Sequence, residues 1–381
     1  MGRKFALMMI LMLSSSLIIS QVTVAQNENW PVLSWIITTP EEQGMNSAKL
    51  QEMELYLDNE GWNNVVDSIL IVRNGCLVYE SYPSTSHNEN TTHHMFSCTK
   101  SFMSALVGIA IDEGYIDGLD DEVLDFFPDL IIENLDERKQ AITIKDLLTM
   151  TSGLDWYDQT DYYQMEDSSD WVKYVLDRPM AHDPGTVWNY NTGGTHILSA
   201  ILNRTCPEGI VEFAESHLFE PLGISGYYWV KDNQGIPIGG TALNLRSRDI
   251  AKFGYLYLRN GIWDGEQIIS ELWVAESTTP VVEMEFDQGH GSGYAYLWWT
   301  YTWDGTYAAR GSYGQYIIVA PSLDIVVVFT GSGGFTVTTL LTQYIFPAAE
   351  YNPQQKFFFI PLIITLVVVV SIGGIFCRKR R

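Results

Sequence analysis

Basic residues and cysteine are both scarce in this chain. Its 381 residues include 22 Lys and Arg against 46 Asp and Glu, which gives a formal net charge of −24. Phosphate recognition depends on clustered Lys and Arg, so this balance argues against a nucleic-acid partner. Four cysteines are present, and one of them, Cys377, lies close to the C-terminus. Cys76, Cys98 and Cys206 are an odd number, so a disulfide would leave one of them unpaired, and no disulfide scaffold is predicted.

Several catalytic and metal-binding motifs are also missing. No Gly-x-Ser-x-Gly elbow is present, so an α/β-hydrolase triad is not indicated. His93 and His94 are adjacent, but no His-Glu-x-x-His run or cysteine cluster completes a set of metal ligands. No metal and no cofactor is therefore expected. With 46% hydrophobic residues and no internal repeat, the chain is predicted to form a globular domain with a sizeable core.

The N-terminal residues have the pattern of an export signal. Arg3 and Lys4 precede an apolar run that extends to about residue 19, and small residues stand at positions 23–25. The sequence therefore predicts a cleaved signal peptide over residues 1–25. An uncleaved N-terminal anchor is the alternative interpretation.

The C-terminal end carries a second long apolar run. Residues 357–377 include no charged side chain and are long enough to cross a hydrocarbon layer of about 30 Å. Residues 378–381 are all Arg or Lys, which favours a cytoplasmic tail. The pattern predicts a single-pass protein of the cell membrane, with one catalytic domain over residues 26–350 on the extracytoplasmic side.

The part between these ends begins with a helix and a hairpin. Asn46 or Ser47 can cap a helix that ends at Gly61. The apolar stripe of this helix consists of Leu50, Met53 and Leu57. Further on, Asn74 and Gly75 separate two runs rich in β-forming residues, a pair that favours a type I′ turn. The first strands are therefore predicted to be an antiparallel pair.

The rest of the domain changes from helices to strands. Residues 97–113 predict a helix, and the middle of the chain is mainly helical, including a periodic segment near residues 247–258. Two apolar runs then flank a turn at residues 321–324, and a helix is predicted over residues 337–344. This order predicts an α+β fold, in which early and late strands form one antiparallel sheet flanked by helices, with an inserted, mainly helical lobe. Binding sites tend to form between such lobes.

Ser97 and Lys100 begin the predicted helix at a spacing of one helical turn. A serine hydroxyl becomes a good nucleophile only when a nearby group accepts its proton, and three positions along a helix bring two side chains into contact. A helix N-terminus and apolar surroundings both disfavour the ammonium form, so Lys100 is a candidate base. A capping serine beside a solvated lysine is the structural alternative.

Three separated blocks extend this pattern. They read "FSCTKSFMSALVGIAIDEGYIDGLDDEV", "ITIKDLLTMTSGL" and "PGTVWNYNTGGTHILSAIL". In order and spacing the chain resembles the serine β-lactamase and penicillin-binding-protein-like family, above all its class C, esterase and 6-aminohexanoate-dimer hydrolase branches. The resemblance runs from about residue 40 to residue 344. It implies a β-lactamase/transpeptidase-like fold.

The resemblance also implies roles for individual residues. Ser97 matches the acylated nucleophile, and Lys100 matches its base. Tyr190 matches the tyrosine of the family's Tyr-x-Asn element, which moves protons to the leaving group and helps to activate the deacylating water. Thr192 stands where that element has Asn, although a hydroxyl can still form a hydrogen bond. A packed core tyrosine is the alternative interpretation of Tyr190.

A third family element, Lys-Thr-Gly or His-x-Gly, falls on residues 309–311. Ala309 replaces the cationic or imidazole residue, which argues against a lactam antibiotic as the substrate. Arg310 could bind a substrate carboxylate through two hydrogen bonds, or form a surface ion pair. By the same alignment, Gly311 lies on the strand beside the site. The backbone N–H groups of Ser97 and Ser312 would form the oxyanion hole.

The predicted function is that of a serine hydrolase that cleaves an amide or ester bond through an acyl-enzyme. Its expected partner is a small-molecule or peptide-like substrate. Two alternatives remain: a non-catalytic cell-surface binding protein on the same fold, or a cell-wall D,D-peptidase or transpeptidase. Trp298 and Trp299 are candidates for a wall of the binding site, although core packing is the commoner use of such a pair.

Overall fold

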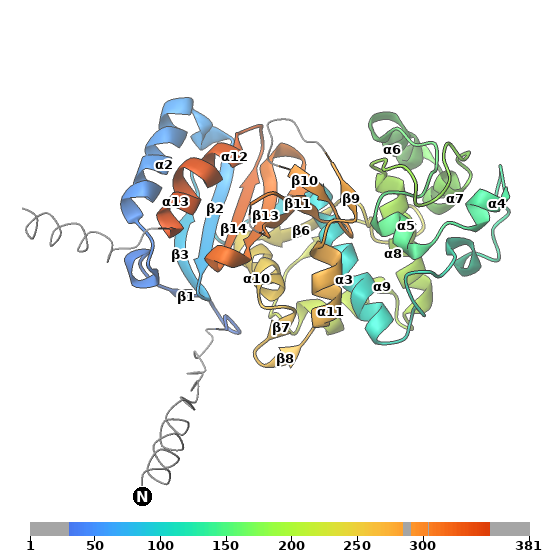
Figure 1. Cartoon of the computed structure of the whole chain (residues 1–381), viewed down its shortest axis with the longest axis horizontal. Helices are drawn as coiled ribbons and strands as arrows, with labels where there is room; N and C mark the ends of the chain where they lie inside the picture. The colour runs from blue at the N-terminus through green and yellow to red at the C-terminus, as the bar shows by residue number, and fades with distance from the viewer. Residues whose placement is uncertain (1–29, 285–290, 304, 351–381) are drawn as a thin grey trace, which may run out of the picture.

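A nine-stranded sheet lies at the centre of the part of the chain that this computed structural model describes, namely residues 30–284, 291–303 and 305–350. Its strands are β1 (Ile36–Ile37), β2 (Val66–Arg73), β3 (Cys76–Ser81), β9 (Val282–Glu283), β10 (Gly291–Tyr294), β11 (Trp299–Tyr301), β12 (Tyr307–Gly311), β13 (Gln315–Ala320) and β14 (Ile325–Gly331). The order across the sheet is β1-β3-β2-β14-β13-β12-β11-β10-β9 (Figure 1). Early and late strands therefore share one sheet, as predicted. The pairing is antiparallel except at one edge, where β1 is parallel to β3.

The other described elements are helices, two small sheets and several short 3-10 and π turns. The small sheets contain β4 (Thr92–His94), β6 (Leu243–Arg246) and β5 (Tyr228–Trp229), and β7 (Ile262–Trp263) with β8 (Glu266–Gln267). The helices are α2 (Ser47–Glu60), α3 (Thr99–Asp112), α4 (Glu137–Gln140), α5 (Ile144–Leu148), α6 (Asp158–Asp167), α7 (Trp171–Leu176), α8 (Thr192–Thr205), α9 (Ile210–Ala214), α10 (Ser247–Leu258), α11 (Glu271–Thr278), α12 (Val337–Leu340) and α13 (Phe346–Ala349). The mixture confirms the predicted α+β class.

Local signals in the sequence set the first elements. The side chain of Asn46 caps α2 by accepting a hydrogen bond from the N–H of Ala48, and Gly61 ends the helix in the left-handed conformation. The predicted stripe of α2 is buried. Asn74 and Gly75 both have positive φ angles, 50° and 73°, which a type I′ turn requires. The predicted helix cap and hairpin are therefore confirmed.

The two faces of the sheet belong to different cores. On β2, Leu70 and Val72 pack in the core that contains α3 and α10, whereas Ile69 and Ile71 pack in the core beneath α2, α12 and α13. This alternation follows from the two-residue period of a strand. In Figure 1, α2, α12 and α13 cover one face of the sheet. A sheet covered on both faces is a rigid platform for the elements beside it.

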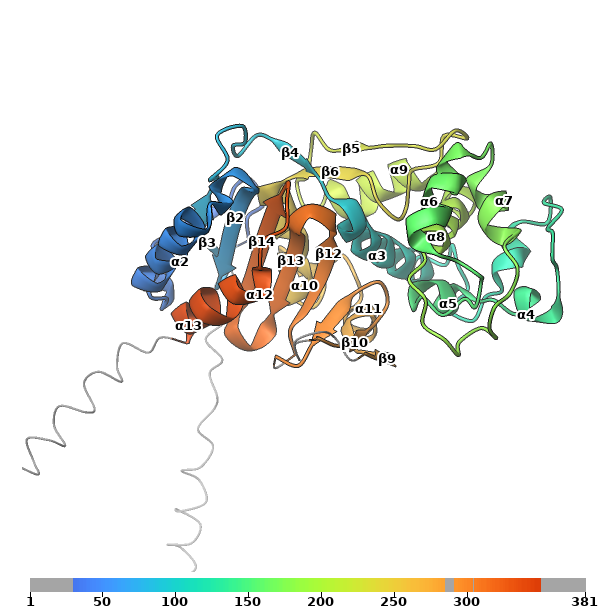
Figure 2. The ribbon, with the colours of Figure 1, turned by 90° about the horizontal axis from the view of Figure 1, so that it is seen from above.

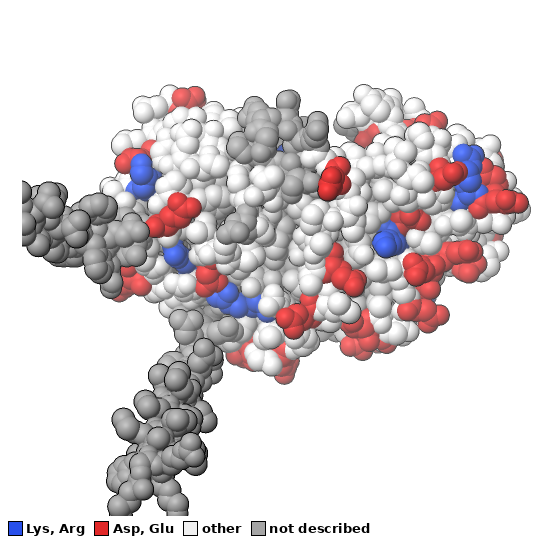
Figure 3. Space-filling view, in the orientation of Figure 1, with Lys and Arg blue, Asp and Glu red and all other residues white. Residues whose placement is uncertain are grey.

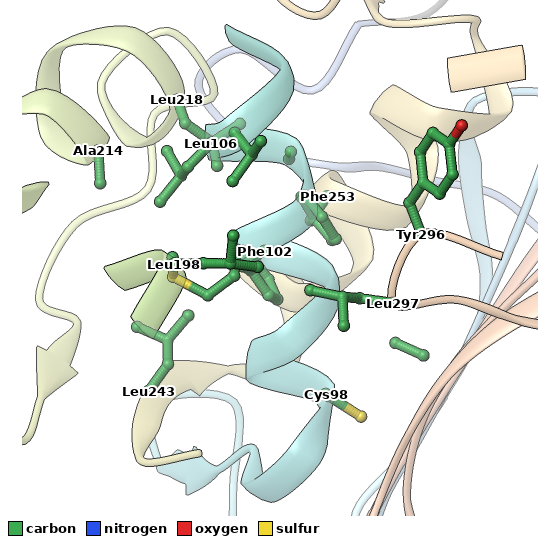
Figure 4. Packing of buried hydrophobic residues seen from close by; sticks show 14 of the residues in the cluster. Cys98, Phe102, Leu106, Leu198, Ala214, Leu218, Leu243, Phe253, Tyr296 and Leu297 are labelled. Atoms are coloured by element: carbon green, nitrogen blue, oxygen red, sulfur yellow. The ribbon is translucent and has the colours of Figure 1, made fainter. Parts of the chain in front are cut away.

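Helix α3 lies between the sheet and the helical lobe. The lobe contains α4 to α8, which gather at the end of the molecule opposite α2 in both views (Figures 1 and 2). Residues from several elements surround α3 in Figure 4, and the ring of Phe102 stacks on that of Phe253 at 3.8 Å. Both Phe102 and Leu106 are fully buried. The inserted helical lobe predicted from the sequence is therefore present, and α3 connects it to the sheet.

The surface reflects the excess of acidic residues. On the face shown in Figure 3, Asp and Glu lie over both the sheet region and the helical lobe, whereas Lys and Arg occupy only a few places. The formal charge of −24 is thus displayed as a dispersed acidic surface. Such a surface suits neutral or cationic binding partners better than anionic ones.

The prediction of a single-pass membrane protein is corrected. Among the described residues, no helix is long and apolar enough to cross a bilayer. The helices α2, α3 and α8 have 14 residues each, and a membrane-spanning helix needs about 20. The segments on which the prediction depended, residues 1–25 and 357–381, lie outside the described residues.

Candidate active site

Ser97 lies on a short 3-10 turn, Phe96–Cys98, that leads directly into α3. Phe96 adopts the left-handed backbone conformation, with φ 46°, which is uncommon for a bulky residue and tends to occur at functional sites. The N–H of Phe96 donates a hydrogen bond of 3.1 Å to Nδ1 of His94. The turn thereby holds the half-buried Ser97 at the lining of a cleft.

Lys100 lies beneath Ser97 and is almost completely buried, with 1% of its surface exposed. Its Nζ donates to Oγ of Ser97 at 3.1 Å and to the carbonyl oxygen of Gly240 at 2.6 Å. The same nitrogen lies 4.9 Å from the ring centre of Tyr190. The ion pairs of lysine in the described ranges do not include Lys100. The amine is therefore held by a hydroxyl and a carbonyl oxygen rather than by a carboxylate.

Gly240, which was not predicted as a site residue, fits between Lys100 and Thr192. A Cβ atom at this position would lie 2.5 Å from Cγ2 of Thr192 and 3.4 Å from Nζ of Lys100. Only a residue without a side chain leaves room for this approach. The contact joins positions that are 140 residues apart, so the sequence does not indicate that Gly240 and Lys100 meet. A Gly-Gly pair at residues 239–240 is the one available signal.

Tyr190 lies just before α8, close to the lysine. The side chain of Asn191 caps this helix by accepting a hydrogen bond of 2.8 Å from the N–H of Gly194. The ring of Tyr190 stacks on that of Trp299, with 6.2 Å between the ring centres and 26° between the planes. The cap fixes the backbone and the stacking fixes the ring, so the phenol is held on the side of the Lys100 amine.

Thr192 begins α8 and is bound to a carboxylate from α6. Its backbone N–H donates to Oδ1 of Asp158 at 2.9 Å, and its hydroxyl donates to Oδ2 at 3.1 Å. Asp158 also accepts from the indole N–H of Trp156 at 2.9 Å. The hydroxyl that replaces the family's Asn is therefore directed toward Asp158. Asp158 was not predicted from the sequence, because a single acidic residue 34 positions away from Thr192 belongs to no recognisable motif.

Strand β12 lies against the segment that leads to Ser97. A Cβ atom at Gly311 would lie 2.5 Å from the carbonyl oxygen of Met95, so only glycine allows β12 to come this close to the segment before Ser97. The next residue, Ser312, is exposed and lines the same cleft as Ser97. The structure thus brings together Ser97, Lys100, Tyr190, Thr192, Gly311 and Ser312.

Arg310 is placed differently. Its guanidinium lies 4.8 Å from the ring centre of Trp299 and 5.7 Å from that of Tyr316, and it is not among the residues that line the cleft. Burial disfavours the charged guanidinium, but Tyr301 and Tyr316 outweigh this and raise the pKa of Arg310. Of the predicted tryptophan pair, Trp298 is fully buried in the core, whereas the half-buried Trp299 lies between Tyr190 and Arg310.

The cleft above Ser97 has a volume of about 530 Å³, within the range of small-molecule sites. Its lining combines aromatic, hydroxyl and acidic side chains, and no Lys or Arg is among the lining residues that the structure describes. The lining includes Ser97, Asp158, Tyr163, Glu166, Thr192 and Ser312. The cleft is therefore open to a small acyl compound, and its charged groups are acidic.

Cys98 is not a rival nucleophile. Its thiol is fully buried and donates a weak hydrogen bond of 3.4 Å to the carbonyl oxygen of Gln315. Burial raises the pKa of Cys98 far above that of an ordinary thiol. Burial therefore makes the thiol of Cys98 unsuited to nucleophilic attack.

Ser97 precedes α3 by one short turn and contacts the buried Lys100 of that helix, an arrangement typical of serine hydrolases of the SxxK type. The chain belongs to the β-lactamase family, whose sequence model matches residues 63–345. It is 23% identical over 303 residues to the 6-aminohexanoate-dimer hydrolase of Paenarthrobacter ureafaciens. The matched region covers 74% of this chain and 75% of that hydrolase.

Solved structures show the same fold. An octameric penicillin-binding protein homologue from Pyrococcus abyssi matches with a TM-score of 0.64 and 21% identity, covering 79% of this chain and 77% of that one. EstCE1, a hydrolase with promiscuous acyltransferase activity, matches with a TM-score of 0.67 and 17% identity. The match covers 82% of this chain and 99% of EstCE1. The family assignment and the β-lactamase/transpeptidase-like fold expected from the sequence are therefore confirmed.

Proposed function

We propose that Ser97 is the nucleophile of this serine hydrolase and that Lys100 accepts its proton. The observation that carries the proposal is the 3.1 Å contact between Nζ and Oγ, which is within reach for general-base catalysis. Oγ attacks the carbonyl carbon of an amide or ester, the tetrahedral intermediate expels the amine or alcohol, and an acyl-enzyme remains. Water then attacks the acyl group and releases the acid and the free hydroxyl.

Tyr190 and two backbone N–H groups complete the proposed machinery. The phenol, close to Lys100, passes a proton to the leaving group and later helps to activate the water. The N–H groups of Ser97 and Ser312 bind the oxyanion, and their common position at the cleft supports this role. Thr192, bound to Asp158, positions the start of α8 and hence Tyr190.

The charged residues of the cleft suggest the class of substrate. Asp158 and Glu166 are acidic, and no Lys or Arg is found among the described lining residues. An acyl compound with a neutral or cationic group is therefore favoured over one with a carboxylate. The absence of a cation at Ala309 adds to this, because lactam antibiotics carry an anionic group. We expect short-chain esters to be hydrolysed and nitrocefin to be cleaved very slowly.

The catalytic assignment is tested by a hydrolysis screen with p-nitrophenyl esters, D-amino-acid amides, short amide oligomers and nitrocefin. Replacing Lys100 by Met removes the base and should lower kcat by about 10²- to 10⁴-fold. Lys49→Met, on the exposed surface of α2, is the control and should leave kcat unchanged. A folded Lys100→Met variant with the kcat of the wild type would contradict the role of Lys100. A folded wild-type chain that hydrolyses nothing in the screen would favour a non-catalytic binding protein.

The preference for charge is tested with matched esters. Two p-nitrophenyl esters of equal chain length, one ending in an ammonium group and one in a carboxylate, are compared by kcat/KM. We expect the ammonium ester to be preferred and the preference to fall in Glu166→Gln but not in Glu271→Gln, an exposed residue on α11. Equal kcat/KM values for the two esters would refute the preference and leave the catalytic assignment intact.

A further inference from the structure

Two histidines and an aspartate meet on the far side of the segment that leads to Ser97. Asp67 is on β2, His93 is on β4, and His87 lies in the connection between β3 and β4. Asp67 and His93 are each 5% exposed, and His87 is half-buried. One nitrogen or oxygen atom from each residue lies within 4.8 Å of the corresponding atoms of the other two. Three potential metal ligands are therefore collected in one small space.

Nδ1 of His87 lies within hydrogen-bond distance, 3.2 Å, of the hydroxyl of Ser84, but two other polar atoms of this cluster have no such partner. In the described residues, Oδ1 of Asp67 and Nε2 of His93 are buried and have no hydrogen-bond partner. Nδ1 of His87 is 3.2 Å from Oδ1 of Asp67, and Nδ1 of His93 is 3.9 Å from Oδ2. The two imidazole rings stack with 5.1 Å between their centres. A buried polar atom without a partner is unfavourable, and a cation bound at the carboxylate of Asp67 would give Oδ1 the partner that it lacks.

The backbone favours this convergence. On β2, Val66 pairs with Gly331 and Ser68 pairs with Thr330, so Asp67 is the extra residue at an irregularity in the ladder between β2 and β14. Such bulges redirect a side chain from the regular alternation of a strand. Ser68 itself is held by hydroxyl contacts to Ser247 and Thr330 at 2.7 and 2.6 Å. The position of Asp67 is therefore built into the sheet.

We propose that Asp67, His87 and His93 form a binding site for a divalent zinc-type metal ion. Two imidazoles and one carboxylate suit Zn²⁺, whereas Ca²⁺ and Mg²⁺ prefer oxygen ligands. Metal–ligand bonds of about 2.0–2.2 Å in a tetrahedral site separate the ligand atoms by roughly 3.3 Å. The 3.2 Å between Nδ1 of His87 and Oδ1 of Asp67 already matches this separation. The 3.9 Å between Nδ1 of His93 and Oδ2 of Asp67 has to shorten by about 0.6 Å. Three protein ligands leave one position for a water.

The site is structural rather than catalytic. His93 precedes Ser97 by four residues, so the ion ties the start of the nucleophile turn and the connection before it to the central sheet. None of the three ligands lines the cleft above Ser97. Metal binding to the folded chain stabilises it by mass action. Removal of the ion should therefore lower the melting temperature more than it lowers kcat.

The test uses the tag-free full-length chain, stripped with EDTA and dialysed against Zn²⁺. We expect one zinc per chain by elemental analysis, a higher Tm with Zn²⁺ than with EDTA, and the visible absorption of tetrahedral Co²⁺ after substitution with cobalt. Asp67→Asn and His87→Gln should lose the zinc and the difference in Tm. His182→Gln changes an exposed histidine outside the cluster and should keep both.

Three results would overturn the proposal. They are a folded wild-type chain that retains no zinc, a zinc content in Asp67→Asn and His87→Gln that equals that of the wild type, and loss of zinc in His182→Gln alone. The wild-type measurement stands even if a variant fails to fold. Because zinc content is independent of turnover, these results do not depend on the proposed hydrolase activity.

Discussion

Replacing Gly240 by alanine would place a methyl group inside the contact between Lys100 and Thr192. The new carbon would lie 2.5 Å from Cγ2 of Thr192, and carbon atoms pack at about 3.5 Å, so the segment has to move by about 1 Å. Such overpacking destabilises a fold by about 1–3 kcal/mol. A shift of this size at a catalytic group lowers the rate by about 10²-fold. We therefore expect kcat for a p-nitrophenyl ester to fall by about 10²-fold, with a smaller change in KM.

The assay compares kcat and KM with the free energy of unfolding in urea, and rates are normalised to the folded fraction. Gly118→Ala is the matched control, because a Cβ atom there meets nothing within 4 Å and its backbone is not left-handed. Gly118→Ala should behave as the wild type in both measurements. A folded Gly240→Ala variant with the wild-type kcat would refute the argument that the carbonyl of Gly240 positions Lys100.

Three further predictions concern the proton shuttle, the core and a buried carboxylate. Tyr190→Phe keeps the ring against Trp299 but removes the hydroxyl, so steady-state kinetics should show kcat lower by about 10²- to 10⁴-fold with KM little changed; an unchanged kcat would exclude the shuttle role. Leu106→Ala, at a fully buried site, should lower the free energy of unfolding in urea by about 2–5 kcal/mol. The exposed Leu55→Ala should change it by no more than about 0.5 kcal/mol, and equal effects would contradict the assigned core. Burial alone would raise the pKa of Asp232, but hydrogen bonds from His196 and from backbone N–H groups lower this pKa overall. The ionised Asp232 therefore stabilises the fold above about pH 4, and this stabilisation is lost as the pH falls below about 4. Urea midpoints between pH 3 and pH 6 should therefore decline less steeply with acid in Asp232→Asn than in the wild type, and parallel declines would contradict this assignment.

Local signals explain most of what the sequence predicted correctly. The cap at Asn46, the turn at residues 74–75 and the periodicity of α3 each depend on neighbours a few residues away, so they are visible in one sequence. The antiparallel core of the sheet followed from the order of the elements. The parallel edge at β1 did not, because a two-residue strand has no periodic pattern.

The site was predictable only where residues lie close together in the chain or match a family motif. Ser97 and Lys100 are three positions apart, and Tyr190 was placed by resemblance. Gly240 and Asp158 come from distant segments of the chain. The spacing of residues in the sequence does not indicate their contacts with Lys100 and Thr192. The roles of all these residues stay predictions until they are tested.

The proposed metal site was missed for the same physical reason. His93 and His94 were considered as a pair, yet consecutive residues of a strand point to opposite faces. Of the partners of His93, His87 lies six positions earlier in a loop and Asp67 lies on another strand. Only the folded chain brings these three residues together. The single-pass localisation, by contrast, depended on end segments alone, and the helices that the structure describes do not support it.

The central claim is that the hydroxyl of Ser97 is a nucleophile activated by the contact with Lys100. Intact-mass spectrometry after reaction with a fluorophosphonate probe, followed by peptide mapping, tests it most directly. We expect one adduct per folded chain, located on Ser97, absent in Ser97→Ala and formed much more slowly in Lys100→Met. No adduct on the folded wild-type chain, or an adduct that persists in Ser97→Ala, would contradict it.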